Sequence, residues 1–159
     1  MIKIGDKLPE AEFNSFNADG AVKLSTEQVF AGKKVVLIGL PGAFTPTCSM
    51  NHLPSFIEHE AAIKAKGINT IACTAVNDFH VMKAWSKHTG ADGKVIMLAD
   101  GNATFAKAIG LEIDLAGPGM GVRSKRYSML VDNGIVKELN VENAAGVNVS
   151  GADTILSQI

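Results

Sequence analysis

The sequence predicts an α/β fold in which a mixed β-sheet is flanked by helices on both faces. Apolar segments typical of strands alternate with segments of helical periodicity, which is the order of an α/β sheet. The alternation ends in two adjacent strand-like segments joined by Asp132-Asn133-Gly134, a strong hairpin signal. The chain has 159 residues, of which 47% are hydrophobic, so we expect one sizeable core and a single domain over residues 1–159.

Each element is predicted from its apolar spacing and from the turn or capping residues at its ends. Asn17-Ala18-Asp19-Gly20 is a hairpin-turn sequence, Asp78 suits a helix N-cap, and Gly67 and Gly110 suit helix ends. The predicted elements, in chain order, are strands at Glu12–Phe16 and Ala21–Leu24, a short helix after Ser25 or Thr26, a buried strand at Lys33–Leu40, a helix from Cys48 to Gly67, a strand at Ile68–Val76, a helix from Asp78 to His88, a strand at Val95–Leu98, a helix at Ala103–Ile109, strands at Tyr127–Val131 and Ile135–Val141, and a helix from Ala152 to the C-terminus.

Composition and charge argue against several classes of function. Fifteen Lys and Arg against sixteen Asp and Glu give a net charge of −1, with no electrostatic signature for nucleic acid or an acidic membrane. The longest apolar stretch, around Val35–Leu40, is too short to span a bilayer, and Met1–Asp6 lacks the apolar region of a secretory signal. Two cysteines are too few for a disulfide framework, so we expect a reducing compartment, most simply the cytoplasm.

One of the two cysteines, Cys48, lies where a thiol should be ionised. It follows the buried strand that ends at Leu40 and precedes a helical pattern, so it falls in or next to the first helical turn. Unpaired N–H groups and the positive end of the helix dipole favour a thiolate at that place. The alternative is an inert core cysteine, but two prolines and two threonines around it would make a poor core.

The segment also carries Pro-x-x-x-Thr-x-x-Cys, as Pro41, Thr45 and Cys48, and so resembles the peroxiredoxins, which are thiol peroxidases. The longer string PGAFTPTCSMNHLPSF is similar to their atypical or type II subfamily, and most closely to its plant-like and bacterial members. Further matches follow in the family's order: Ala75-Val76-Asn77-Asp78, Phe79, Val81, Lys83-Ala84-Trp85, Leu98-Ala99-Asp100-Gly101 and the run from Gly119 to Tyr127. The resemblance covers nearly the whole chain and is specific, because several separate motifs occur in the right order.

The resemblance implies a thioredoxin-like fold with an N-terminal β-hairpin extension. It implies reduction of hydrogen peroxide and small alkyl hydroperoxides by Cys48 as the peroxidatic nucleophile, which becomes a sulfenic acid. No metal, haem or flavin is implied, since an external thiol supplies the electrons. It also implies a homodimer that pairs through loops around the cysteine helix, here Ala43–Pro46, Phe79–His80 and Gly117–Val122.

Ionisation of the thiol alone is too little for an efficient peroxidase. At pH 7 a free thiol with a pKa of about 8.5 is ~3% ionised, so complete ionisation gains at most ~30-fold. Donors that stabilise the breaking O–O bond are therefore needed. Thr45, three residues before Cys48, can direct its hydroxyl to the peroxide; the alternative is a role only as an N-cap, and the two roles are compatible. Pro41, which has no N–H, can shield the thiolate from water.

A permanent positive charge has three candidates, Arg123, Lys125 and Arg126, just before the predicted strand at Tyr127. Taken by spacing alone, each is expected to be a solvated residue at a strand edge. The resemblance selects Arg126, because peroxiredoxins present an arginine from a late strand to the cysteine sulfur. Arginine suits this role because it stays protonated and its fork can contact sulfur and peroxide together.

Three other features are interpreted as structural, without a direct role in catalysis or in binding a metal or phosphate. His52, four residues after Cys48, is expected to be a partly exposed helix residue or a polar neighbour of the pocket; no third ligand is suitably spaced for zinc. The run Gly117–Gly121 lacks the spacing of a phosphate loop and is predicted to be a mobile surface loop. Trp85 is expected to be a core residue.

Cys73 decides how Cys48 is recycled. It lies mid-strand, where a buried structural thiol is the default, although it remains a possible resolving cysteine. The C-terminal stretch Val147–Gly151 contains no cysteine. Plant-like and bacterial relatives of this kind tend to be recycled by glutathione and glutaredoxin, and sometimes by thioredoxin.

Two other functions remain open at the level of sequence. A thiol-disulfide oxidoreductase is one, but Thr45 stands where a Cys-x-x-Cys site would have its first cysteine. A redox-sensing or chaperone module that uses the same oxidisable thiol is the other.

Overall fold

The computed structural model describes residues 1–159 and is built on a seven-stranded mixed sheet with strand order β2-β1-β5-β4-β3-β8-β9. Strands β3, β4 and β5 run parallel, whereas β8 and β9 are antiparallel and β1 meets β5 antiparallel. The strands are β1 (Glu12–Asn17), β2 (Gly20–Ser25), β3 (Lys34–Gly39), β4 (Thr70–Ala75), β5 (Ile96–Ala99), β8 (Tyr127–Asp132) and β9 (Ile135–Val141). The predicted mixed sheet is therefore confirmed.

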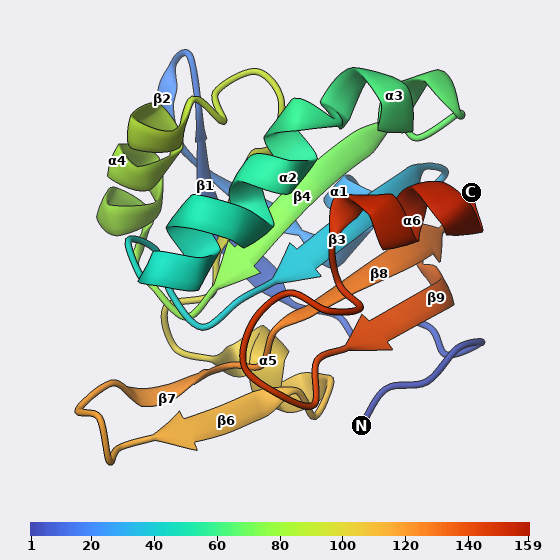
Figure 1. Cartoon of the computed structure of the whole chain (residues 1–159). Coiled ribbons are helices and arrows are strands. Elements are labelled where there is room, and N and C mark those ends of the chain that lie inside the picture. The colour runs from blue at the N-terminus through green and yellow to red at the C-terminus, as the bar shows by residue number, and fades with distance from the viewer.

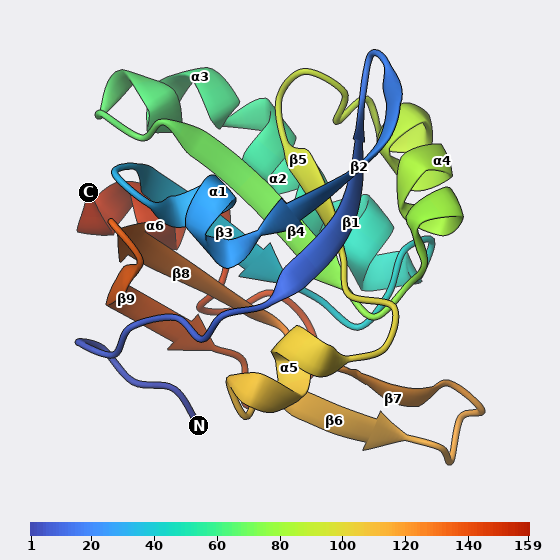
Figure 2. The same ribbon diagram turned by 180° about the vertical axis from the view of Figure 1, so that it is seen from behind.

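Helices cover both faces of the sheet. One face carries the π-helical turn η1 (Cys48–His52), α2 (Leu53–Glu58), α3 (Glu60–Ala65), α4 (Phe79–Thr89) and α6 (Ala152–Gln158) (Figure 1). The opposite face carries α1 (Thr26–Phe30) and α5 (Thr104–Ala108) (Figure 2). No helix is both long enough and apolar enough to cross a membrane.

The continuous apolar run of β3 is explained by burial on both faces. Val36 and Ile38 pack into the core beneath α2 and α4, while Val35 and Leu37 pack into the core beneath α1 and α5. Alternation along β4 places Cys73 in the first of these two cores, which is the layer that also contains Cys48. Both cysteines therefore belong to one packed layer on one side of the sheet.

The N-terminal hairpin turn and the helix cap at Asp78 form where they were predicted, and Ser25 adds a cap that was not. The strands β1 and β2 pair along their whole length, from Glu12↔Ser25 to Asn17↔Gly20, and form the N-terminal hairpin. The side chain of Ser25 caps α1 in a reciprocal capping box with Gln28. The Asp78 carboxylate accepts a hydrogen bond from the Val81 amide and caps α4.

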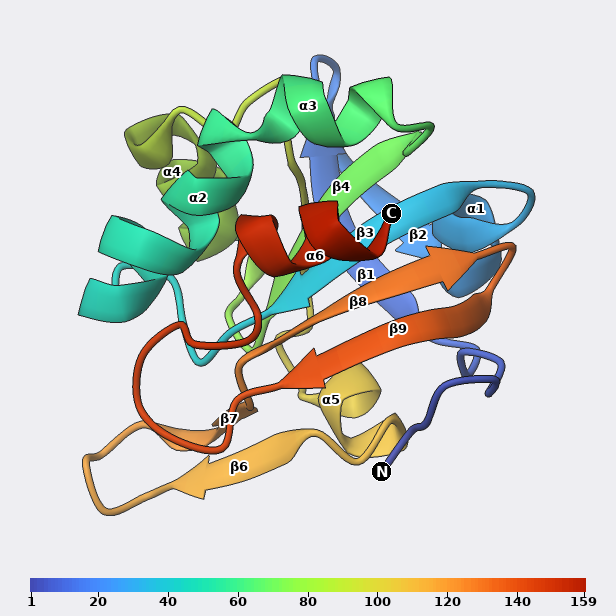
Figure 3. The same ribbon diagram turned by 45° about the vertical axis from the view of Figure 1, so that its right-hand side comes forward.

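One predicted loop gains an unpredicted context, and one predicted helix was wrong. The surface loop expected at Gly117–Gly121 is an exposed turn, but it joins two strands that were not predicted, β6 (Glu112–Leu115) and β7 (Gly121–Ser124), which pair antiparallel in a second sheet. This hairpin extends away from the main sheet (Figure 3). The single helix expected from Cys48 to Gly67 is instead three consecutive pieces, with a break at His59 between α2 and α3.

Candidate active site

Cys48 lies just beyond the carboxyl end of β3, the edge of a parallel sheet at which functional sites usually form. A loop follows Leu40, the helical conformation begins at Pro46, and Cys48 is the first residue of η1. Its side chain is fully buried. In this π-helical turn the Leu53 amide donates to the Cys48 carbonyl, a five-residue step that adds one residue to an α-turn.

Arg126 directs its guanidinium onto the sulfur. Its Nη2 donates to Cys48 Sγ over 3.2 Å. Pairing of Gly39 with Tyr127 places Arg126 beside the loop that leaves β3, so the sheet register itself brings the two residues together. Arg126 is the residue that the resemblance selected among the three cationic candidates, and it is the one in contact with Cys48.

Thr45 and Pro41 both lie in the loop that leads from β3 to Cys48. The Thr45 hydroxyl donates to the Gly42 carbonyl over 2.7 Å, and no hydrogen bond joins it to Cys48 or caps the helix. Its lone pairs remain available to accept a hydrogen bond. Pro41 is partly buried at the start of the loop.

Arg123 is not the solvated residue that spacing suggested. Its Nε donates to the Met120 carbonyl over 2.9 Å, and its Nη1 donates to the Pro41 carbonyl over 3.2 Å. A methyl group at Gly42 would lie 2.7 Å from Arg123 Nη1, so any larger residue there would displace the end of the Arg123 side chain. Asn77 adds a second support, because its Oδ1 accepts from the Ala43 amide over 2.9 Å. No local pattern in the sequence predicts either contact.

His52 was expected to be partly exposed or a neighbour of the pocket; the first expectation was wrong, since the residue is fully buried. Its Nε2 lies 2.9 Å from the Ser150 carbonyl, and its Nδ1 lies 3.1 Å from Arg126 Nη1. A carbonyl can only accept and a guanidinium can only donate, so His52 is neutral with its proton on Nε2. The pKa of His52 is lowered from 6.5 to about 4; burial is the main cause, and the nearby Arg126 charge acts in the same direction.

Cys73 has a different environment. It is fully buried in the middle of β4, with β3 and β5 paired on either side. Burial raises the pKa of its thiol well above the ordinary value. Both cysteines are free thiols, and Trp85 is fully buried in the same layer, as expected.

A groove of about 700 Å³ adjoins the site. Its lining includes Pro41, Thr47, Lys125 and Arg126, together with apolar side chains such as Ile113 of β6. The groove is therefore lined in part by the residue whose guanidinium contacts the sulfur.

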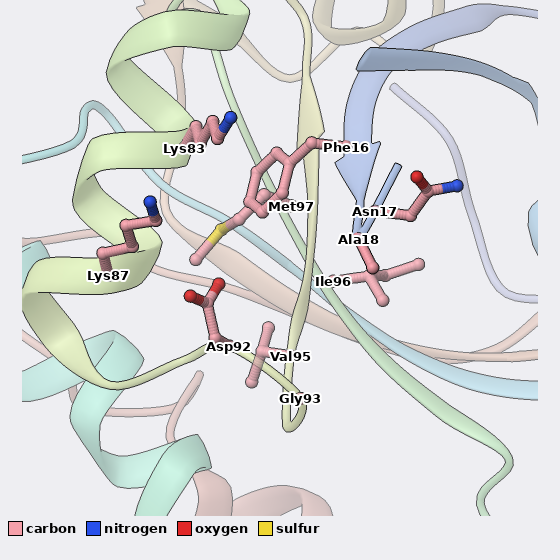
Figure 4. A pocket seen from close by; sticks show the side chains of 10 residues that line it. All are labelled: Phe16, Asn17, Ala18, Lys83, Lys87, Asp92, Gly93, Val95, Ile96 and Met97. Atoms are coloured by element: carbon pink, nitrogen blue, oxygen red, sulfur yellow. The ribbon is translucent and has the colours of Figure 1, made fainter. Parts of the chain in front are cut away.

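A separate hollow of about 430 Å³ lies between α4 and the strands β1 and β5 (Figure 4). Lys83 and Lys87 of α4 line one side of it, opposite Phe16 and Met97. Its lining contains neither cysteine and no arginine, so this hollow is not part of the Cys48 site. No group of three or more His, Cys, Asp or Glu side chains is arranged to hold a metal ion.

The chain matches the Redoxin family model over residues 3–156. It is 44% identical over 159 residues to Peroxiredoxin-2C of Oryza sativa subsp. japonica, covering 99% of this chain and 98% of the relative. It is 47% identical over 163 residues to the chloroplastic Peroxiredoxin-2E-2 of the same plant, covering 99% of this chain and 72% of that one. The structure of reduced Prx3 from Vibrio vulnificus in complex with H2O2 superimposes with a TM-score of 0.95 and 49% identity, covering 99% of both chains.

These similarities establish the thioredoxin-like peroxiredoxin fold and the thiol-dependent peroxidase activity that goes with it. The chain belongs to the redoxin family and, within it, to the type II, plant-like peroxiredoxins.

Proposed function

We propose that Cys48 is the peroxidatic nucleophile and that hydrogen peroxide and small alkyl hydroperoxides are its substrates. The observation that carries this proposal is the 3.2 Å hydrogen bond from Arg126 Nη2 to a fully buried Cys48 Sγ. A charged donor in a water-poor site favours the thiolate and is already directed at the reacting atom. The Vibrio vulnificus relative described as a complex with H2O2 supports the choice of peroxide.

In the proposed step, the Cys48 thiolate attacks the terminal oxygen of the peroxide. The S–O bond forms as the O–O bond breaks, the sulfur is oxidised by two electrons, and the leaving alkoxide or hydroxide takes a proton to become alcohol or water. Arg126 stabilises the negative charge that moves along the O–O bond. Thr45 exchanges its Gly42 partner for a peroxide oxygen, and Pro41 limits the access of water.

Recycling by glutathione, with or without glutaredoxin, is the regeneration route that we propose; thioredoxin is the alternative reductant. Glutathione attacks the Cys48 sulfenic acid, releasing water and forming a mixed disulfide. A second thiol then releases Cys48 and forms oxidised glutathione. The position of Cys73 in the middle of a sheet supports this one-cysteine cycle, since a disulfide requires Cα atoms within about 7 Å and converging side chains. The cycle uses no bound cofactor.

Mass spectrometry of the oxidised protein tests this proposal. One equivalent of peroxide with glutathione should add one glutathione to Cys48 and leave Cys73 reduced. Peroxide alone should give a sulfenic acid that proceeds to the sulfinic acid as more peroxide is added. A stoichiometric Cys48–Cys73 disulfide formed without glutathione would overturn the one-cysteine cycle, and oxidation confined to Cys73 would overturn the assignment of Cys48.

We also infer a symmetric homodimer in a reducing compartment such as the cytoplasm. Apolar side chains in and near the candidate loops support the dimer: Phe44 is 50% exposed and Val122 is 39% exposed. Phe79, by contrast, is partly buried against Phe16. Sedimentation at micromolar concentration should give a dimer that Phe44→Asp weakens. A wild-type protein that is monomeric well above that concentration would remove this claim.

A further inference from the structure

Glu142, the residue directly after β9, collects an unusual number of hydrogen bonds. Its Oε2 accepts from the amides of Asn148, Val149 and Ser150 over 2.9, 2.8 and 2.8 Å, and from the Ser150 hydroxyl over 2.6 Å. One carboxylate oxygen thus ties down the far end of the loop that connects β9 to α6 (Figure 3). These hydrogen bonds outweigh the opposing effect of burial and lower the pKa of Glu142, so it is ionised at neutral pH.

The loop held by Glu142 reaches the reacting sulfur through three consecutive contacts. The Ser150 carbonyl accepts from His52 Nε2 over 2.9 Å. His52 Nδ1 accepts from Arg126 Nη1 over 3.1 Å, and Arg126 Nη2 donates to Cys48 Sγ over 3.2 Å.

The hydrogen bond between His52 and Ser150 determines which nitrogen of His52 can accept from Arg126. The Ser150 carbonyl keeps the His52 proton on Nε2, which leaves Nδ1 able to accept from Arg126. If the carbonyl turned away, the proton could occupy Nδ1 instead, and Arg126 Nη1 would lose its acceptor. Arg126 is further tied to Glu142 through the backbone, since its carbonyl accepts from the Glu142 amide over 3.0 Å.

We propose that Glu142 is a positioning residue for peroxide reduction: by holding Ser150, it fixes the His52 tautomer and thereby aims Arg126 at Cys48. This inference rests on the proposed role of Cys48 and Arg126. Glu142 does not touch the sulfur or the peroxide; it acts through the geometry of two intervening residues. Such support matters because a misplacement of about 1 Å in a catalytic group can cost about 100-fold in rate.

The test is a set of variants measured by single-turnover oxidation with hydrogen peroxide. Glu142→Ala should slow oxidation of the reduced enzyme roughly 10- to 100-fold. Glu142→Gln, which keeps an accepting oxygen of the same reach and guards against misfolding, should lose less. The matched control is Glu138→Ala, which removes a carboxylate from β9 that makes no hydrogen bond or ion pair, and it should stay within about twofold of wild type.

A second readout separates positioning from a general loosening of the fold. In an Arg126→Ala background, adding Glu142→Ala should change the oxidation rate by less than about twofold, since the group it positions is already absent.

Three outcomes would overturn the proposal. They are an unchanged oxidation rate in folded Glu142→Ala, an equal loss in Glu138→Ala, and a full additional loss in the Arg126→Ala background. None of these outcomes affects the assignment of the nucleophile, which fails only if Cys48→Ser retains peroxide reduction.

Discussion

The two cysteines of this chain form a natural comparison, because they share a layer and a degree of burial but not an environment. Both side chains are fully buried in the same core on one face of the sheet. Cys73 lies mid-strand, surrounded by apolar side chains, and burial raises the pKa of its thiol. Cys48 begins a helical turn and accepts a hydrogen bond from the Arg126 guanidinium.

The difference shows that two equally buried thiols can have different polar surroundings. Only Cys48 has a permanent cation beside its sulfur and lies in the first turn of a helix, the two features that favour a thiolate in proteins. The cation is held in turn by His52, whose neutral Nδ1 accepts from it without adding a charge. A strand interior, where neighbouring backbones use every hydrogen-bonding group, offers Cys73 no such donors.

Replacing the two thiols should give the largest contrast. Cys48→Ser should abolish peroxidase turnover while the far- and near-ultraviolet circular dichroism remains that of the wild type, because a neutral hydroxyl cannot take the peroxide oxygen. A coupled assay that follows glutathione oxidation measures the loss. Turnover above a few per cent of wild type would move the active thiol to Cys73.

Removing Arg126 tests this comparison further, because Cys48 would then be a buried thiol without a cationic donor, as Cys73 is. Arg126→Ala should slow peroxide reduction by about 30- to 1000-fold, the equivalent of roughly 2–4 kcal/mol for one charged donor. Stopped-flow mixing of the reduced protein with peroxide measures the step. A rate within twofold of wild type would show that Arg126 does not act on the sulfur.

The matched control for this variant is Lys125→Ala. Lys125 is the adjacent cation and lines the same groove, but it makes no hydrogen bond to the cysteine loop. Arg123 is unsuitable as a neutral control, because it holds the Pro41 carbonyl and its removal should also disturb the loop. An equal loss in Lys125→Ala and Arg126→Ala would point to general electrostatics in place of a specific donor.

Most of the fold could be predicted because its signals are local. The turn at Asp132-Asn133-Gly134, the capping box at Ser25 and the N-cap at Asp78 each depend on residues a few positions apart. The pairing of β6 with β7 could not be predicted in this way. Both strands have only four residues, and the glycine-rich turn between them is as typical of a loop as of a hairpin.

In the candidate site, too, the features that depend on neighbouring residues could be predicted and the long-range contacts could not. The position of Cys48 followed from local pattern, whereas the choice of Arg126 needed the family resemblance. The contacts that hold the arginine join residues far apart: Arg126 and His52 are 74 positions apart, and His52 and Ser150 are 98 apart. No periodicity or spacing rule encodes such a contact, so the sequence predicted neither the full burial of His52 nor any role for Glu142.

The histidine that supports Cys48 should make the stability of the fold depend on pH. An unfolded histidine titrates near pH 6.5, whereas burial lowers the pKa of His52 to about 4 in the folded chain. Between these values the unfolded chain binds a proton that the folded chain does not, so the free energy of unfolding should fall as pH falls from about 6.5 to about 4. The loss attributable to this residue is about 3 kcal/mol.

Urea denaturation at a series of pH values measures this loss. His52→Gln should flatten the dependence between pH 6.5 and pH 4, and His88→Gln, at an exposed position of α4, should leave it unchanged. An identical pH dependence in wild type and His52→Gln would show that His52 protonates as readily in the folded chain as in the unfolded one.

The smallest expected effect on activity belongs to the second thiol. Cys73→Ser should keep glutathione-dependent turnover within about twofold of wild type but lower the free energy of unfolding by roughly 1–3 kcal/mol, because a polar hydroxyl replaces the thiol in a fully buried position. Cys73→Ala, which adds no polar group, should be destabilised less than the serine variant. Turnover with glutathione and urea denaturation measure the two properties separately. A Cys73→Ser protein that is stable, is oxidised by peroxide and yet is not recycled would make Cys73 the resolving residue, and the contrast between a reactive and a structural thiol would no longer hold.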